Sequence, residues 1–329
     1  MEFVSHKTLV LAFALSRMSL STGFGFASVD KAPSAAHESI QTPAKSVTPT
    51  DVTMIDTVKI DNRPLPDIEG LMHAVETNQR AAETIEKDYL YRSTWTLKEL
   101  DGHGGVKKTE TQEYDVFWIE GVPVHRLMKK NGKELSAEDQ KKESERIDKE
   151  IVKVKEKRRK ADEKGKETGP HGEEEVTVSR LLELGRFTNA RRVEWNGRDT
   201  IAVDFAGDPN AKTKTRFEEV IRDMVGTAWV DEQDRTLVKA QGHFLNSFKI
   251  GGGLVVNIQK GTSFSMEQRK VNNEVWLPAM VEGQGEARTL LFFNLHGSVQ
   301  GVESDYRKFK ATSTIVPVES TVPPTPPTK

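Results

Sequence analysis

"GTAWVDEQDRTLVKAQGHF", residues 226–244, decides the fold class of this 329-residue chain. Two apolar runs flank the polar stretch from Asp231 to Asp234, and this pattern predicts a β-hairpin with strands at 226–231 and 235–246. No catalytic motif falls within the hairpin. The function of a sheet built from such strands must therefore be inferred from the remaining sequence.

Similar strand patterns occur on both sides of this hairpin. Residues alternate with a period of two in "YLYRSTWTLK" (89–98), and the turn "DGHGG" (101–105) leads to a second strand at 106–120. In "GRDTIAVDF" the same period places Ile201 and Phe205 on one face of a strand. The remaining predicted strands lie at 122–130, 186–195, 248–259, 263–271, 274–282, 286–296 and 300–309. Joined by short turns, these strands predict a mainly β (α+β) fold with one large curled antiparallel sheet and helices packed on it.

Two long helices of opposite character are expected. The segment 67–88 has apolar residues such as Leu71 at helical spacing, which predicts one buried face. The segment 136–168 is strongly charged and has few apolar residues, so we expect a solvated helix that projects from the sheet. Its interspersed charges favour a surface helix with i,i+4 ion pairs. The alternative is that "KVKEKRRK" (153–160) forms a basic arm for anionic lipid headgroups or nucleic acid.

The two ends of the chain differ in composition from the segment between them. Residues 1–27 combine a basic start, an apolar stretch and small residues, which is typical of a signal peptide and predicts export. Residues 28–63 are rich in Ser, Thr, Pro and Ala and are expected to form a flexible linker. The proline-rich tail at 311–329 is expected to be extended or disordered. The folded domain is therefore predicted at 64–310, with the charged helix 136–168 as an insertion.

Composition and motifs argue against several classes of protein. The formal net charge of −2 gives no global attraction to nucleic acid, and the absence of cysteine removes disulfides, thiolate zinc sites, cysteine nucleophiles and a cysteine for lipid attachment. The motifs HExxH, GxSxG and GxxxxGK[ST] are absent. The eight histidines lack ligand spacing, so no metal, cofactor or catalytic residue is predicted. Asp204 and Asp231 would have to meet in space to form a catalytic carboxylate pair, and strand carboxylates more often face solvent.

Several segments together suggest a family. The helix at 67–88 is followed by "YLYRSTWTL" and "TQEYDVFWIEGVPVHRLMKKNGKELS", then by "GRDTIAVDF" and the hairpin 226–244, and finally by "VWLPAM", "ARTLLFFN" and "SDYRKF". In this order and spacing, from Pro66 to Phe309, the chain resembles the LolA/LolB superfamily of outer-membrane lipoprotein-sorting carriers. The resemblance implies an incomplete β-barrel of about eleven strands, with helices over a concave side that holds acyl chains of lipoproteins or related lipids. The charged helix and the tail have no clear counterpart in the small carriers.

These features lead to one leading hypothesis and two alternatives. We expect an exported, periplasmic, soluble and non-enzymatic carrier that holds the acyl chains of a lipoprotein or lipid in an apolar half-barrel cavity and exchanges them with membrane-associated donor and acceptor proteins. The residues expected to line the cavity are Trp95, Phe205, Trp229, Phe244, Phe248, Trp276, Met280 and Phe293. One alternative is a periplasmic sensor or scaffold whose charged helix and tail bind another protein. The other is a hydrolase with an unrecognised carboxylate site.

Overall fold

The structure, a computed structural model, describes residues 57–58, 63–163, 165, 178–214, 216–250, 256–289 and 293–309. Within these ranges, side chains are described for all residues except 57–58, 216–217, 249–250, 256–257, 287–289 and 293–295. The predicted signal peptide, most of the predicted linker and the predicted tail lie outside the described residues. Thr57 and Val58, inside the predicted linker, form a short strand that pairs with Val193 and Glu194.

In the described ranges, fourteen strands form one antiparallel sheet. The longer strands are β2 (Tyr89–Leu100), β3 (Val106–Ile119), β4 (Val122–Lys130), β6 (Gly185–Trp195), β7 (Arg198–Gly207), β8 (Met224–Asp231), β9 (Thr236–Phe244), β12 (Ser263–Val271), β13 (Val275–Thr289) and β14 (Phe293–Lys308). The strands of two or three residues are β1 (Thr57–Val58), β5 (Lys133–Glu134), β10 (Phe248–Ile250) and β11 (Val256–Ile258). The main path runs β1-β6-β7-β8-β9-β12-β13-β14-β2-β3-β4-β5, and β11 pairs with both β10 and β13.

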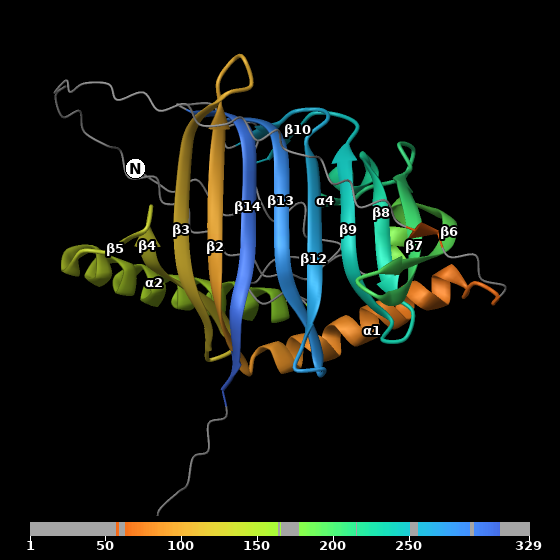
Figure 1. The fold of residues 1–329 in the computed structure, drawn as a ribbon, viewed down its shortest axis with the longest axis horizontal. Coiled ribbons are helices and arrows are strands. Elements are labelled where there is room, and N and C mark those ends of the chain that lie inside the picture. The colour runs from red at the N-terminus through yellow and green to blue at the C-terminus, as the bar shows by residue number, and fades with distance from the viewer. Residues whose placement is uncertain are drawn as a thin grey trace, which may run out of the picture.

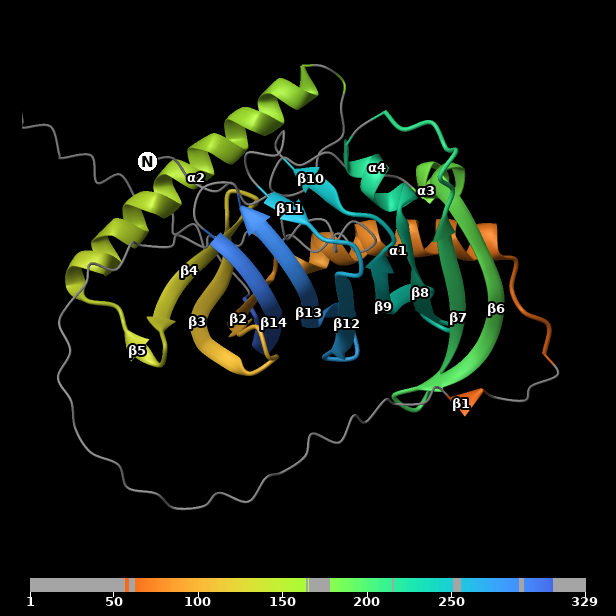
Figure 2. The same cartoon turned by 90° about the horizontal axis from the view of Figure 1, so that it is seen from above.

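The sheet is strongly curved and open. Figure 2 shows it as an arc, with β4 near one end and β6 near the other, and no pairing closes the arc between the described residues of these ends. The predicted class, a mainly β fold with an incomplete antiparallel barrel and helices on its concave side, is confirmed. A sheet that curves in this way leaves one face turned inward, and that face must be covered by helices or by something else.

The turns follow the local chemistry of the sequence. Asn196 and Gly197 join β6 to β7 with φ angles of 50° and 74°, the left-handed conformation that a two-residue hairpin turn requires. Asn131 and Gly132 join β4 to β5 with φ angles of 49° and 75°. Asn and Gly adopt this conformation at the lowest cost among the residues, which is why both turns can be located from the sequence.

Three predicted strand boundaries were wrong. The expected break between 274–282 and 286–296 is absent, because β13 runs without interruption from Val275 to Thr289 and stays paired with β14 across Gly283 and Gly285. The break expected before residue 300 is likewise absent from β14. The segment 248–259 contains two short strands, β10 and β11, which pair with each other and not end to end as one strand.

Among the described residues, four helices accompany the sheet: α1 (Ile68–Glu86), α2 (Ala137–Asp162), α3 (Val178–Leu184) and α4 (Arg216–Arg222). α1 begins after Asp67, whose carboxylate accepts a hydrogen bond of 2.8 Å from the Gly70 backbone N–H. α1 crosses the concave side of the sheet (Figures 1 and 2), and it buries Leu71, Met72 and Val75 there. In the part of the chain that the structure describes, each helix is too short or too polar to cross a membrane.

The charged helix α2 does not project from the sheet, and that expectation was wrong. It packs beside β4, and its side chains bond the backbone groups on the outer edge of that strand. Glu143 accepts a hydrogen bond of 2.8 Å from the Leu127 N–H, and Arg146 donates one of 2.7 Å to the His125 carbonyl. Apart from β3, the two residues of β5 are the only strand partners of β4 within the described part of the chain. α2 therefore covers an exposed strand edge, which would otherwise be open to pairing with another chain.

The contacts of α2 bear on both interpretations of this helix, a surface helix with i,i+4 ion pairs or a basic arm for anionic lipid headgroups or nucleic acid. Ion pairs at i,i+4 join Lys142 to Glu138 and Lys160 to Glu156, as the surface-helix interpretation predicts. Within the basic run, Arg158 donates a hydrogen bond of 3.0 Å to the Gly121 carbonyl. These cationic groups are engaged within the protein, which favours a structural role for the helix.

Removing the edge contact of α2 has a predictable effect. Replacing Glu143 with alanine is expected to speed amide hydrogen exchange at Leu127 by about tenfold, because Glu143 accepts the hydrogen bond of this N–H and the lost bond costs about 1–1.5 kcal/mol. Replacing Lys142, which lies on the exposed side of α2, serves as the control and should leave exchange in β4 unchanged. Equal exchange at Leu127 in both variants would contradict the edge-covering role of Glu143.

Candidate functional site on the concave face

The concave face carries the largest apolar cluster of the domain. Leu71 and Val75 of α1 pack there on residues from seven strands, with Trp95, Ile201 and Met266 among them. Trp95 is 2% exposed and lies across Gly301, where a Cβ would come within 2.8 Å of the indole ring. Glycine at this position therefore lets the tryptophan lie flat on the sheet.

Three of the predicted lining residues form a second concave cluster. Phe205, Phe244 and Phe248 come together beneath α3 and α4, whose Leu181 and Ile221 cover them. The ring centroids of Phe244 and Phe248 are 5.0 Å apart in an edge-to-face arrangement. The period-two pattern that grouped Ile201 with Phe205 is thus reproduced in the structure, since both side chains lie on the concave face.

The other predicted lining residues are not all on this face. Trp229 and Trp276 lie on the opposite, convex face, in a separate cluster with Ala202 and Val238. The alternation along β8 explains this placement, because Ala228 and Val230 on either side of Trp229 point to the concave face.

Two predicted lining residues remain. Met280 is half-buried and pairs across the sheet with Val302, and its sulfur lies 3.8 Å from the side-chain nitrogen of Gln300. The side chain of Phe293 lies outside the described residues. The eight predicted residues therefore do not form one lining surface.

A row of buried polar groups runs along the concave face, and sequence reasoning missed it. Trp95 Nε1 donates a hydrogen bond of 2.8 Å to Ser93 Oγ, and Ser93 donates one of 3.0 Å to Glu303 Oε1. Ser93 is fully buried and Glu303 is 3% exposed. The second carboxyl oxygen, Glu303 Oε2, is buried and has no hydrogen-bond partner among the described residues. A buried polar atom of this kind needs an explanation, because it has lost its hydration without gaining a partner.

The environment of Glu303 keeps its carboxyl group neutral. Burial raises the pKa of Glu303 from 4.5 to about 8, and the hydrogen bond from Ser93 offsets this only in part. The nearby carboxyl of Glu86, at the end of α1, also raises it. Burial likewise raises the pKa of Glu86 to about 8. The rings of Tyr91 and Tyr306 stack beside these groups with centroids 4.8 Å apart, and burial raises the pKa of both phenols.

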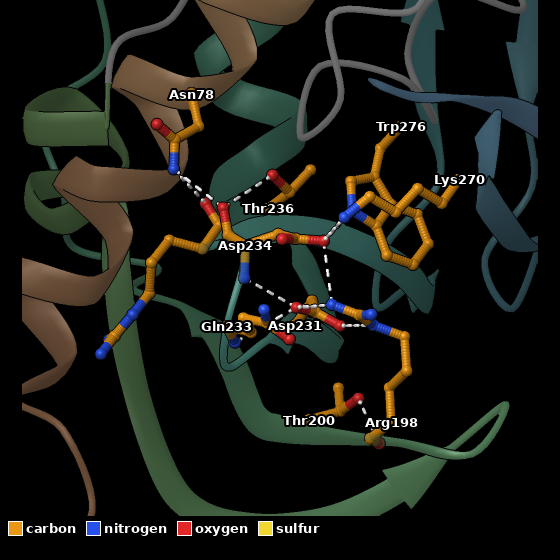
Figure 3. A network of polar contacts seen from close by, with 10 residues as sticks. Asn78, Arg198, Thr200, Asp231, Gln233, Asp234, Thr236, Lys270 and Trp276 are labelled. Carbon is orange, nitrogen blue, oxygen red and sulfur yellow. Dashed lines mark hydrogen bonds and ion pairs between the residues drawn. The ribbon is translucent and has the colours of Figure 1, made fainter. Parts of the chain in front are cut away.

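The polar turn between β8 and β9, from Asp231 to Asp234, holds neighbouring strands together through side-chain hydrogen bonds, and it is called here the clamp (Figure 3). Asp231 is 1% exposed, and both of its oxygens accept hydrogen bonds from the guanidinium of Arg198. Asp234 Oδ2 accepts hydrogen bonds from Lys270 Nζ at 2.7 Å and from Trp276 Nε1 at 2.8 Å. Burial opposes ionisation of Asp234, but the hydrogen bonds from Lys270 and Trp276 outweigh it and lower its pKa. The turn thus ties β7, β12 and β13 together.

The same turn also holds α1. Asn78 Nδ2 donates hydrogen bonds of 2.9 Å and 3.2 Å to the backbone carbonyls of Asp234 and Arg235 (Figure 3). The carboxylate pair considered from the sequence is not assembled, because Asp204 lies opposite Thr227 and Asp231 lies opposite Thr200 along the paired strands. Asp204 bonds Arg191 and not Asp231.

Neither of two clefts lined by described residues is the apolar hollow that the sequence predicts. A cleft of about 470 Å³ has a mixed, largely polar lining that includes Thr227, Gln241, Ser265 and Glu282. These residues alternate with those of the concave clusters and so lie on the convex face. A second cleft, at Leu97 and Lys108, measures only about 10 Å³. Leu71 and Val75 of α1 pack with the buried side chains of the concave face. No three His, Asp or Glu side chains in these ranges converge as metal ligands.

Comparison with known proteins gives likenesses only at the level of structure. No family model matches the sequence, and no curated protein matches it. The crystal structure of a domain named as an outer membrane lipoprotein-sorting protein, from Vibrio parahaemolyticus, has 11% identity and a TM-score of 0.36, and the match covers 76% of this chain and 96% of that one. A LolA superfamily protein from Nitrosomonas europaea has 8% identity and a TM-score of 0.25, with the same coverage of 76% and 96%.

A third likeness is to the MucA/MucB complex of Pseudomonas aeruginosa, with 9% identity, a TM-score of 0.21, and coverage of 72% of this chain and 99% of that one. At these TM-scores the likenesses do not by themselves establish a relationship, and the architecture rests on the strand order of the chain itself. The first two structures bear the name of the family that the sequence resembles.

Proposed function

We propose that this protein is an exported, periplasmic, non-enzymatic carrier that binds the acyl chain of a lipoprotein or lipid on the concave face of its open sheet. The observation that supports it most is the way α1 covers this face. Of the 19 residues of α1, Leu71, Met72 and Val75 are buried, and Ala82 and Ile85 are partly buried against a separate cluster. The largest apolar cluster of the domain is therefore covered in part by an element with a small apolar contact.

Burial of the α1 side chains and burial of an acyl chain on the concave face contribute similar free energies. Burying three apolar side chains of α1 contributes roughly 5–9 kcal/mol, at about 1.5–3 kcal/mol each. A dodecanoyl chain that buries about ten methylene groups contributes about 8 kcal/mol. An acyl chain of ordinary length can therefore take the place of residues 71–75 of α1 on the concave face, while the end of the helix at Glu86 stays in place. The described structure, in which α1 packs on the concave face, then corresponds to the state without cargo.

Native mass spectrometry of the full chain, followed by lipid extraction, tests this function. Co-purified acyl species that are released on unfolding are the expected result. An empty protein that instead co-purifies with a stable protein partner would favour the sensor or scaffold alternative. Membrane-associated donor and acceptor proteins are proposed as the source and the destination of the cargo.

The hydrogen bonds from Asn78 to the turn between β8 and β9 lead to a prediction for the binding of an amphiphile. Replacing Asn78 with alanine removes the hydrogen bonds to the Asp234 and Arg235 carbonyls and makes α1 easier to displace. We expect the affinity for the neutral probe 1-monododecanoylglycerol to rise by about fivefold, which corresponds to about 1 kcal/mol less work to free the helix. Isothermal titration calorimetry measures the change.

The matched control is the neighbouring residue Thr77, whose hydroxyl bonds the His73 carbonyl within the same helix. Replacing Thr77 with alanine should leave the affinity unchanged, because no contact between α1 and the sheet is lost. An unchanged or weakened affinity in the Asn78 variant would mean that α1 does not have to move for binding.

A further inference from the structure

The polar end of the concave face is acidic. Glu86, Ser93 and Glu303, with the stacked rings of Tyr91 and Tyr306, form what is called here the acidic patch, beside the last turn of α1. A carrier of fatty acids or of other anionic amphiphiles needs a cation or several backbone N–H groups at this place. The acidic patch offers the opposite chemistry.

We propose that the acidic patch binds a primary ammonium group at the polar end of an amphiphile whose hydrocarbon chain lies on the concave face. This inference rests on the carrier function proposed above and adds the chemical class of the cargo. An ammonium donates three hydrogen bonds and carries a compact positive charge. Carboxyl oxygens and aromatic faces are the groups that complement it.

The hydrogen bonds within the patch leave an acceptor for such a group. The donors run in one direction, from Trp95 Nε1 to Ser93 Oγ and from Ser93 to Glu303 Oε1. Glu303 Oε2 at the end of this row is buried and without a partner among the described residues. An ammonium beside Oε2 would supply the missing donor, and Glu86, at the end of α1, would supply a second carboxyl group.

The charged groups around the patch leave it acidic. From α1 and the residue after it, Glu83, Glu86 and Lys87 face this region, and the phenols of Tyr91 and Tyr306 face it from β2 and β14. β12 contributes Arg269. The cations are engaged: Arg269 donates to the Glu303 backbone carbonyl, and Lys87 lies 6.0 Å from the centroid of the Trp118 ring. An ammonium group would therefore bring positive charge to a region in which the carboxyl groups Glu83, Glu86 and Glu303 outnumber the cations Lys87 and Arg269.

Proton release gives the proposal a measurable signature. The pKa values of Glu86 and Glu303, each about 8, mean that both carboxyl groups keep their protons at neutral pH in the absence of a cation. An ammonium favours the ionised form and displaces protons. Its affinity should therefore rise as the pH increases toward 8, by about tenfold per pH unit for each proton displaced. Binding of a neutral amphiphile should not show this dependence.

The test is calorimetric titration of the full chain at about pH 6.5 and pH 8.5, with each probe below its micelle concentration. The probes are dodecylammonium, dodecanoate, neutral 1-monododecanoylglycerol, and butylammonium, which lacks the long chain. The variants are Glu303→Gln, Glu86→Gln and the double variant, with Glu69→Gln, an exposed position in the first turn of α1, as the control. Glutamine keeps the size of the side chain and an acceptor for Ser93, so the fold is retained.

We expect dodecylammonium to bind at least tenfold more tightly at pH 8.5 than at pH 6.5, and more tightly than dodecanoate at both values. The double variant should lose this pH dependence and still bind 1-monododecanoylglycerol as the unmodified chain does. Equal affinity for the cation and the anion, or a pH dependence that survives in the double variant, would overturn the ammonium site and leave the carrier function standing.

Two further outcomes have distinct meanings. If none of the three dodecyl probes binds, the carrier function itself fails. If butylammonium binds as tightly as dodecylammonium, the patch recognises a small amine without the help of the concave face, which overturns the assignment of an amphiphile.

Discussion

Replacing Glu303 with glutamine is expected to stabilise the folded protein by roughly 3–5 kcal/mol at pH 8.5, and to change its stability little near pH 4. The pKa of this carboxyl group rises from 4.5 to about 8 on folding, chiefly because of burial. Between these two values the folded state keeps a proton that the unfolded state releases. The free energy of unfolding of the unmodified protein therefore falls as the pH increases through this window.

Urea denaturation between pH 4 and pH 9 measures this effect as the difference between the variant and the unmodified protein. Glu86 titrates with the same sign, so the Glu303 variant should retain part of the pH dependence. Glutamine at the exposed position Glu69 is the control and should leave the curve unchanged. A Glu303 variant that is less stable than the unmodified protein at pH 8.5 would show that the carboxylate is satisfied in the folded state, which would contradict the described geometry.

Replacing Arg198 with alanine is expected to lower the free energy of unfolding by about 3 kcal/mol. Its guanidinium bonds both oxygens of Asp231 and lies 2.9 Å from Asp234 Oδ2. Asp231 is 1% exposed and would be left with only the backbone donors of Gln233 and Asp234. Removing one partner of a buried pair costs more than the pair contributes, because the remaining charge stays buried.

The comparison for this variant is Arg63→Ala. Arg63 pairs with Asp199 at 2.6 Å, but its side chain is 52% exposed, so the loss should stay below about 1 kcal/mol. Both variants are measured by urea denaturation at neutral pH. If the two losses were equal, Asp231 would not depend on Arg198, and the clamp at the hairpin turn would not stabilise the sheet.

The fold could be predicted largely from local patterns. The alternation in 197–205 and 226–244 identifies the strands, and the turn at Asn196 and Gly197 places a hairpin. These signals lie within a few residues of one another. The break expected between 282 and 286 was wrong, because a pattern of neighbouring residues cannot show that β13 stays paired with β14 across this segment.

The site could be predicted only in part. A period of two separates the residues of a strand into two sets, but it does not show which set a distant helix covers. Trp229 and Trp276 were therefore placed with Phe205 and Phe244, although they lie on the convex face. The acidic patch was missed because Ser93 and Glu303 are 210 residues apart in the sequence. Glu303, within the charged run "ESDYRK", has the sequence context of an exposed residue.

The most direct test of the account is hydrogen–deuterium exchange of α1 in the presence and absence of saturating 1-monododecanoylglycerol. We predict faster exchange at residues 71–75 in the complex, because the acyl chain replaces Leu71, Met72 and Val75 on the concave face, with no gain in exchange in β7 and β8. A bound complex in which α1 exchanges as slowly as before, or more slowly, would contradict the claim that the chain and the helix compete for this face.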